Sequence, residues 1–137
     1  MIVIGEKINA TLKSAKEIIQ NRDRDKLLEL ATSQAKAGAS VIDINVGTGV
    51  GTAEDEIEAM KWTVETVQAE VETDLCIDSA DPSVLDAGLA ARDGRPSMIN
   101  STKATEETLS AIMPLAAKYE ARLVGLAMDD SGIPKTV

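Results

Sequence analysis

The sequence predicts an α/β fold built on a parallel β-sheet. Short apolar runs rich in β-branched residues recur along the chain, at 2–5, 41–46, 75–78, 97–100 and 123–128. They are nearly continuous in apolar character, as the strands of a buried parallel sheet are. Longer segments with helical periodicity separate them. Strand–helix–strand units of this length imply parallel strands that are joined by right-handed crossovers.

The first two helices of this alternation are expected at 25–37 and 54–72. Segment 25–37 carries an apolar stripe and is followed by Gly38, a residue type that commonly follows the end of a helix. In 54–72 the apolar residues step by three and four positions, which places them on one helix face: Ile57, Met60, Val64, Val67 and Val71.

Two more helices complete the pattern. Asp81 and Pro82 fit an N-cap and a first helical residue, so a helix should begin there, after the third strand. The last helix is expected at 105–120, where Pro114 should bend it because proline removes a backbone donor. The stripe expected to be buried on this helix consists of Leu109, Ile112, Met113 and Ala116.

Composition excludes several classes of protein. The net charge of −9 and the near absence of aromatic residues argue against a nucleic-acid binder or a protein of anionic membrane surfaces. The chain has no histidine, which excludes a Ser-His-Asp triad, a His-based zinc site or a His ligand to a corrinoid from these residues. The only cysteine, Cys76, lies in an apolar strand and is expected to be a buried, inert thiol. A single cysteine and no apolar run of membrane-spanning length predict a cytoplasmic protein.

Polar residues gather where the predicted strands end. The carboxyl ends of parallel strands form the ligand-binding edge of α/β folds. Carboxylates and carboxamides suit a flat polar heterocycle better than a phosphate-rich ligand. The polar residues at these strand ends are Glu6, Asn9, Asp43, Asn45, Asp78, Ser79, Asn100, Ser101, Asp129 and Asp130. Each of them could instead only form a turn or cap the next helix. Their shared position at successive strand ends predicts a site.

The glycine-rich loop at 47–52 has two interpretations. It follows a strand and precedes a helix, as a dinucleotide-binding loop does. However, Thr52 stands where the third glycine of that motif belongs, and the loop follows the second strand. We therefore expect a loop that caps the following helix through Thr52 and Asp55.

Five segments together resemble a known family. They are 4–9 (IGEKIN), 38–47 (GASVIDINVG), 75–79 (LCIDS), 98–102 (MINST) and 123–128 (LVGLAM), followed by 131–135 (SGIPK). In this order and spacing they resemble the methyltetrahydrofolate:corrinoid/iron–sulfur protein methyltransferases. Those enzymes belong to the pterin-binding family, with dihydropteroate synthase and the folate domain of cobalamin-dependent methionine synthase.

The resemblance implies a fold and a site. It implies a TIM (β/α)8 barrel, of which this sequence contains about five of eight β/α strands. Residues 1–137 are thus expected to be one pterin-binding domain that lacks strands six to eight. It would be either a fragment or a shortened protein that associates to cover its open edges. A flavodoxin-like, five-stranded doubly wound sheet is the alternative. By motif, the residues expected to bind the pterin are Asp78 and Asn100, and with less support Asn9, Asp43 and Asn45.

The implied activity is the transfer of the N5 methyl group of methyltetrahydrofolate to the cobalt of a corrinoid (cobalamin) on a partner protein. The enzyme would be a homodimer without a metal ion of its own, and no catalytic residue is assigned. A non-catalytic pterin-binding or assembly fragment is one alternative. Dihydropteroate synthase-like activity is another, although the cationic phosphate ligands that it needs are scarce here.

Overall fold

The computed structural model describes residues 1–128 and 131–133, and in these residues strands and helices alternate along the chain. The strands are β1 (Ile4–Asn9), β2 (Val41–Asn45), β3 (Asp74–Asp78), β4 (Ser97–Lys103) and β5 (Arg122–Leu126). The helices are α1 (Lys13–Gln20), α2 (Arg24–Lys36), α3 (Ala53–Gln68), α4 (Pro82–Ala91) and α5 (Glu106–Lys118). No helix among these residues is long and apolar enough to cross a membrane.

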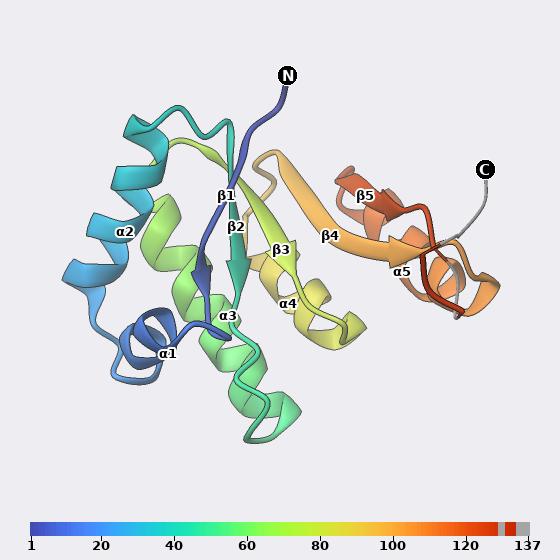
Figure 1. Ribbon diagram of the computed structural model, residues 1–137, viewed down its shortest axis with the longest axis horizontal. Helices are drawn as coiled ribbons and strands as arrows, with labels where there is room; N and C mark the ends of the chain where they lie inside the picture. Colours follow the sequence, from blue (N-terminus) through green and yellow to red (C-terminus); the bar gives the residue numbers. More distant parts are fainter. Residues whose placement is uncertain (129–130, 134–137) are drawn as a thin grey trace.

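The strands form a single sheet in which they follow one another in chain order, and every neighbouring pair is parallel. Figure 1 shows α1 and α2 at one end of the sheet and β5 with α5 at the other. A flavodoxin-like sheet would have the order 2-1-3-4-5, so that alternative is wrong. Sequential parallel strands are the arrangement of the N-terminal part of a TIM barrel, which confirms the expected fold class.

The two faces of the sheet differ. One face packs on the helices and forms the main core, in which strand residues such as Ile44, Ile77 and Ile99 meet helix residues such as Met60 and Leu85. A smaller cluster contains strand residues alone: Val41, Cys76, Met98, Ile4 and Val124. The helices therefore cover one face, and the opposite face of β1–β4 carries the candidate site.

Several element boundaries differ from the expectation. Strand β1 occupies Ile4–Asn9, where a strand was expected at 2–5, so Asn9 is the last residue of the strand. Strand β5 ends at Leu126, before the expected limit of 128. Helix α1 (Lys13–Gln20) was not anticipated, because it is short and Leu12 at its N-cap provides no side-chain hydrogen bond.

Helix α5 corrects the expected buried stripe. It contains Pro114, as predicted, but Leu109 and Met113 are exposed and only Ile112 is fully buried. The helix packs on β4 and α4 along the side that Ile112 occupies. Ala116, the remaining residue of the stripe, is partly buried and packs against the main core.

Candidate functional site

Four of the expected site residues lie in one row across the sheet. In the parallel register Asn9 pairs with Asn45, Asn45 with Asp78, and Asp78 with Asn100. They are the terminal residues of β1, β2 and β3 and the fourth residue of β4. Neighbouring strands lie about 4.8 Å apart, so the row forms a polar band at the carboxyl ends of the strands.

Asn45 and Asp78 form the centre of the row. The Asn45 Nδ2 donates to Asp78 Oδ2 at 2.8 Å, and the backbone N–H of Gly47 donates to Asn45 Oδ1 at 3.0 Å. Because the Gly47 N–H occupies the amide oxygen, the Asn45 amide nitrogen turns to Asp78. The other carboxylate oxygen of Asp78, Oδ1, has no hydrogen bond within the described part of the chain and can accept one from a ligand.

Asn9 completes the row at its β1 end. Its Oδ1 accepts from both the backbone N–H of Thr11, at 2.9 Å, and the Thr11 hydroxyl, at 2.7 Å. This Asx turn is the structural role that a strand-end asparagine can have without a ligand. The Asn9 Nδ2 is thus the group that Asn9 could offer to a ligand, in contrast to the acceptor at Asp78.

Asp43 lies one pleat below the row on β2, on the same face as Asn45. Only 1% of its surface is exposed, and its Oδ1 accepts from Asn100 Nδ2 at 3.2 Å. Burial, together with the negative charges of Asp78 and Glu6, raises the pKa of the Asp43 carboxyl to about 6, against the lowering effect of the hydrogen bonds from Asn100 and Cys76. The structure therefore brings all five expected residues together, four in the row and Asp43 beneath it.

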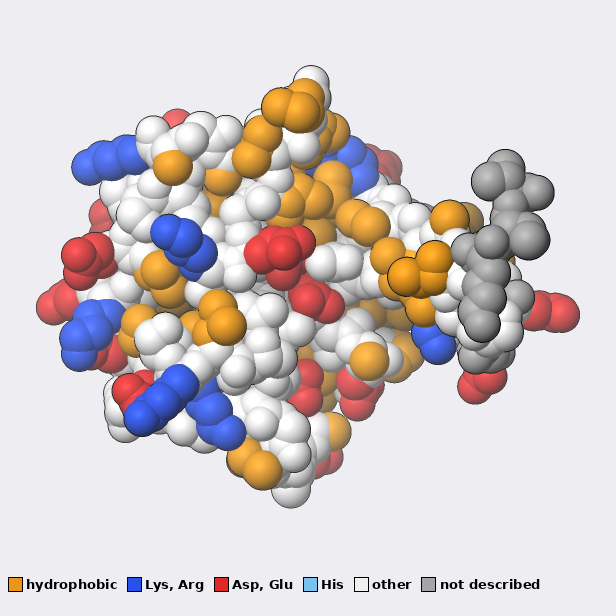
Figure 2. Space-filling view, viewed as in Figure 1, with side chains coloured by type: hydrophobic (Ala, Val, Ile, Leu, Met, Phe, Trp, Pro, Cys, Tyr) orange, Lys and Arg blue, Asp and Glu red, His pale blue; other side chains and the backbone are white. Residues whose placement is uncertain are grey.

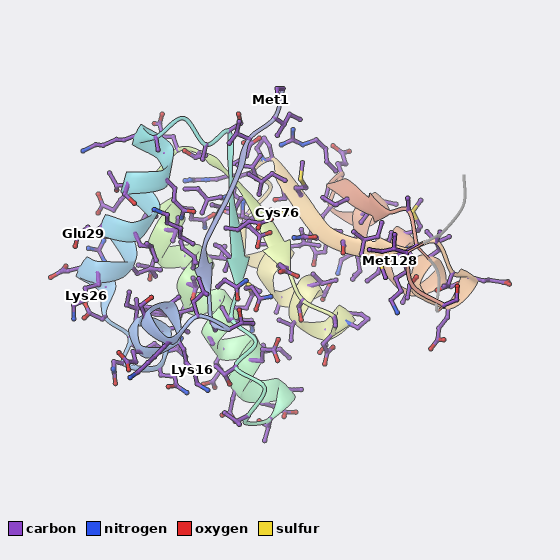
Figure 3. All side chains as sticks on the ribbon, viewed as in Figure 1. Met1, Lys16, Lys26, Glu29, Cys76 and Met128 are labelled. Atoms are coloured by element: carbon purple, nitrogen blue, oxygen red, sulfur yellow. The ribbon has the colours of Figure 1, made fainter. Side chains whose placement is uncertain are left out.

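Cys76 pairs with Asp43 in the register and is fully buried, as the sequence predicts. Burial raises the pKa of the thiol, and the nearby charges of Asp43 and Asp78 raise it further. A thiol held in its protonated form is a poor nucleophile, so Cys76 is a packing residue beneath the site. Figure 3 shows Cys76 within the sheet, far from Lys26 and Glu29 on α2.

The charge around the site is mostly negative. Figure 2 shows a small group of acidic side chains near the middle of the molecule in this view, bordered by hydrophobic and uncharged surface. No group of three or more His, Cys, Asp or Glu within residues 1–128 and 131–133 is placed to hold a metal ion. Asp129 and Asp130, which the sequence also suggests, lie outside the described residues.

A cavity of about 390 Å³ adjoins the row where β3 and β4 end. Besides Asp78, its polar lining comprises Ser79, Ser101, Lys103, Glu107 and Thr108. Glu107 and Thr108 belong to α5 and were not among the expected site residues. No sequence pattern marks them, because they reach the site only through the packing of α5 on β4.

The glycine-rich loop caps α3, as predicted. The Thr52 hydroxyl accepts from the Asp55 backbone N–H at 3.2 Å, and the Asp55 carboxylate accepts from the Thr52 backbone N–H at 2.9 Å. This reciprocal pair is a capping box at the N-terminus of α3. The loop thus has a structural role, and the row of polar residues lies beside it at the end of β2.

Comparison with known proteins places the chain in a class. A family model described as "Pterin binding enzyme" matches residues 5–137, so the chain belongs to the pterin-binding enzyme family. It is 37% identical over 139 residues to a methylcorrinoid:tetrahydrofolate methyltransferase of Eubacterium limosum, which confirms the resemblance seen in the sequence motifs. It is also 30% identical over 142 residues to a methionine synthase of Mycobacterium tuberculosis, and 29% identical over 143 residues to that of Mycobacterium leprae.

The coverage of these relatives is unequal. The alignment takes in 100% of this chain and 50% of the Eubacterium limosum protein. For the Mycobacterium tuberculosis methionine synthase the shares are 99% of this chain and 12% of the relative, and for that of Mycobacterium leprae 100% and 12%. The chain therefore spans about half the length of the first relative and a small part of the other two.

Proposed function

We propose that this chain forms the N-terminal part of the pterin-binding site of a methyltransferase. The enzyme would move a methyl group between N5 of tetrahydrofolate and the cobalt of a corrinoid on a partner protein. The observation that carries the proposal is a pair of acceptor oxygens on adjacent strands, Asp78 Oδ1 and Asn100 Oδ1, neither of which accepts a hydrogen bond within residues 1–128 and 131–133. A pterin presents a ring N–H and an exocyclic amino group along one edge, and such donors match two acceptors.

The five residues have different proposed roles in this site. Asp78 and Asn100 would hydrogen-bond the pterin ring directly and hold N5 in register for transfer. Asn9 would offer its Nδ2 at the edge of the row, while Asp43 and Asn45 would support Asn100 and Asp78. The corrinoid would supply the cobalt that gives or accepts the methyl group. These 137 residues contain no histidine, so none of them would give the cobalt a histidine ligand.

The direction of transfer is part of the proposal. The resemblance in the sequence implies transfer from methyltetrahydrofolate to cobalt, whereas the name of the Eubacterium limosum relative begins with the methylcorrinoid. Both directions make or break the same bond to N5, so the same residues would hold the ring. When the methyl group leaves N5, N5 must gain a proton or a hydrogen bond. Neither Asp78 nor Asn100 is proposed to donate that proton.

The test is calorimetric titration of the full-length protein with methyltetrahydrofolate. Asp78→Asn replaces an ionic acceptor, and we expect the affinity to fall about tenfold or more, with the pH profile of methyl transfer retained. Asp86→Asn is the matched control, because Asp86 lies on α4 and pairs with Lys118 and Tyr119 away from the row. A wild-type protein that does not bind the folate, or an unchanged affinity in Asp78→Asn, contradicts the proposal.

Turnover separates the enzyme from a binding module. The full-length protein is mixed with tetrahydrofolate and methylcobalamin, and then with methyltetrahydrofolate and reduced cobalamin. Methyl transfer in either mixture supports the methyltransferase, and folate binding without transfer supports the non-catalytic alternative. The homodimer and the cytoplasmic location that the sequence suggests are also proposals, and native mass spectrometry checks the first.

A further inference from the structure

The hydrogen bond between Asp43 and Asn100 crosses a whole strand. Asp43 is on β2 and Asn100 on β4, so the bond passes over β3, between the register levels of Cys76 and Asp78. Asp43 lies on the face of the sheet that the helices do not cover, yet only 1% of its surface is exposed. A buried carboxyl is costly, and this one does not take part in an ion pair among the described residues.

The bond determines the direction of the Asn100 amide. An asparagine side chain has a donor end and an acceptor end, whereas an ionised carboxylate only accepts. Ionised Asp43 therefore requires Asn100 to turn Nδ2 toward it. The Asn100 Oδ1 is then left on the other side, where it has no hydrogen-bond partner among residues 1–128 and 131–133.

Asn45 provides the contrast within the same row. Its amide is fixed by a backbone group, because the Gly47 N–H donates to Oδ1 at 3.0 Å. A backbone N–H cannot change from donor to acceptor, so the Asn45 amide keeps one orientation at every pH. Asn100 is instead oriented by a group that can gain a proton.

We propose that Asp43 is a positioning residue that keeps the acceptor oxygen of Asn100 turned toward the bound heterocycle. The inference rests on the proposed pterin site. When Asp43 takes up a proton, its O–H can donate to Asn100 Oδ1, and the amide turns to present Nδ2 to the ligand. The site then offers a donor where a pterin edge also has a donor, and binding weakens.

The surroundings of Asp43 place this change near neutral pH. Asp78 on β3 and Glu6 on β1 are the acidic groups that act on it, and the Cys76 thiol and the Asn100 amide donate to it. The nearest cation on β5, Arg122, pairs with Asp74 at 2.9 Å at the opposite ends of the strands. Together with burial, these groups raise the pKa of Asp43 to about 6.

The first experiment follows the Asn100 side chain itself. Side-chain amide resonances of the full-length protein, without ligand, are recorded by NMR from pH 4.5 to 8 and assigned with Asn100→Ala. We expect the Asn100 amide to shift with a midpoint near pH 6, and the shift to vanish in Asp43→Asn. An Asn100 amide that does not titrate overturns the proposal, and this result does not depend on whether the protein binds a folate.

The second experiment measures the affinity for methyltetrahydrofolate against pH. In the wild type we expect the affinity to fall roughly tenfold between pH 7.5 and 5, since a donor opposite a donor loses a hydrogen bond. Asp43→Asn should bind more weakly at pH 7.5, with a flatter profile. In the Asn100→Ala background, adding Asp43→Asn should cause no further loss, because Asp43 acts through Asn100.

Cys76→Ala is the matched control for packing beneath the row. It removes the other hydrogen-bond partner of Asp43 but leaves the Asn100 amide intact. We expect the affinity at pH 7.5 to be retained and the midpoint of the pH profile to rise, because the thiol lowers the pKa of Asp43. A Cys76→Ala variant that loses affinity as Asp43→Asn does would show a general packing effect and overturn the positioning role. A wild-type protein that binds no folate contradicts the proposed function, while the NMR titration still decides whether Asp43 orients Asn100.

Discussion

The Asn45 side-chain nitrogen donates a hydrogen bond to Asp78 Oδ2 at 2.8 Å, across the gap between β2 and β3. The bond neutralises no charge, but it occupies one carboxylate oxygen and leaves the other for a ligand. It also joins two residues that occupy the same register position. The acceptor that the site presents therefore depends on a neutral donor next to it.

Replacing that donor by an acceptor should disable the site. In Asn45→Asp two carboxylates face each other on adjacent strands, and their repulsion favours protonation of one of them. We expect the affinity for methyltetrahydrofolate at pH 7 to fall at least tenfold, as measured by calorimetric titration. Asn21→Asp adds the same charge at an exposed position after α1 and should bind as the wild type does. Equal affinities in the wild type and Asn45→Asp would contradict this role.

Gly88 allows α4 to lie close to the sheet and to α3. A Cβ at this position would lie 2.7 Å from Ile77 Cγ2 and 2.9 Å from Met60 Cγ, and both of these residues belong to the main core. Alanine is favoured over glycine in helices by about 1 kcal/mol. Overpacking a core costs about 1–3 kcal/mol. We expect Gly88→Ala to lower the free energy of unfolding by about 1 kcal/mol, measured by urea denaturation.

Gly125 is the control for this substitution. It lies on β5, and a Cβ there would meet no atom within 4 Å. Gly125→Ala should leave the urea midpoint unchanged or raise it slightly. If Gly88→Ala is as stable as Gly125→Ala, then α4 can move away from β3 without cost, and the close packing of this helix is not a constraint on the fold.

The sequence was sufficient for most of the alternation of strands and helices, and it predicted which polar residues gather at the strand ends. Asn45, Asp78 and Asn100 each follow a run of buried, mostly apolar residues, so the pattern of single strands is enough to find them, whereas Asn9 lies beyond the strand expected at 2–5. The register between strands could not be predicted in this way, because it depends on how neighbouring strands are staggered. That Asn9, Asn45, Asp78 and Asn100 align follows from pairings between residues that are 22 to 36 positions apart.

Two features could not be predicted because they depend on tertiary packing. The bond from Asn100 to Asp43 joins residues 57 positions apart across an intervening strand, and no local pattern encodes it. Helix α1 has only two fully buried residues, Ala15 and Ile19, so its apolar stripe is too short to recognise. The stripe expected on α5 was wrong for the opposite reason: its periodicity is clear, but Leu109 and Met113 are exposed.

The capping box of α3 should contribute to stability independently of the site. Thr52→Ala removes the hydroxyl that accepts from the Asp55 N–H, and such a loss costs about 1 kcal/mol. We expect the urea midpoint to fall accordingly and the affinity for methyltetrahydrofolate to be retained. Thr32→Ala, within α2, is the control and should have a smaller effect. A large loss of affinity in Thr52→Ala would instead show that the loop contacts the ligand.

Burial of Asp43 should make the protein less stable as the pH rises. The pKa of Asp43 is about 6 in the folded protein and 3.8 for the unperturbed group. The folded state therefore binds the proton more tightly, and stability falls as the pH rises from about 4 to 6. Asp43→Asn removes this penalty, so the variant should be more stable than the wild type at pH 8, by up to about 3 kcal/mol. Urea denaturation at pH 3 and pH 8 measures the difference, which should nearly vanish at the lower pH, below the pKa of the unperturbed group.

Asp81 should show the opposite dependence and serves as the control. It caps α4, and hydrogen bonds from the Ser83 hydroxyl and backbone N–H lower the pKa of its carboxyl. The stability that it contributes is present at neutral pH and is lost on acidification, so Asp81→Ala should destabilise the protein at pH 8 and less so near pH 3. If Asp43→Asn were instead less stable than the wild type at pH 8, the Asp43 carboxylate would be a stabilising group. A carboxylate that destabilises the fold is evidence of a role in the site, and that evidence would then be lost.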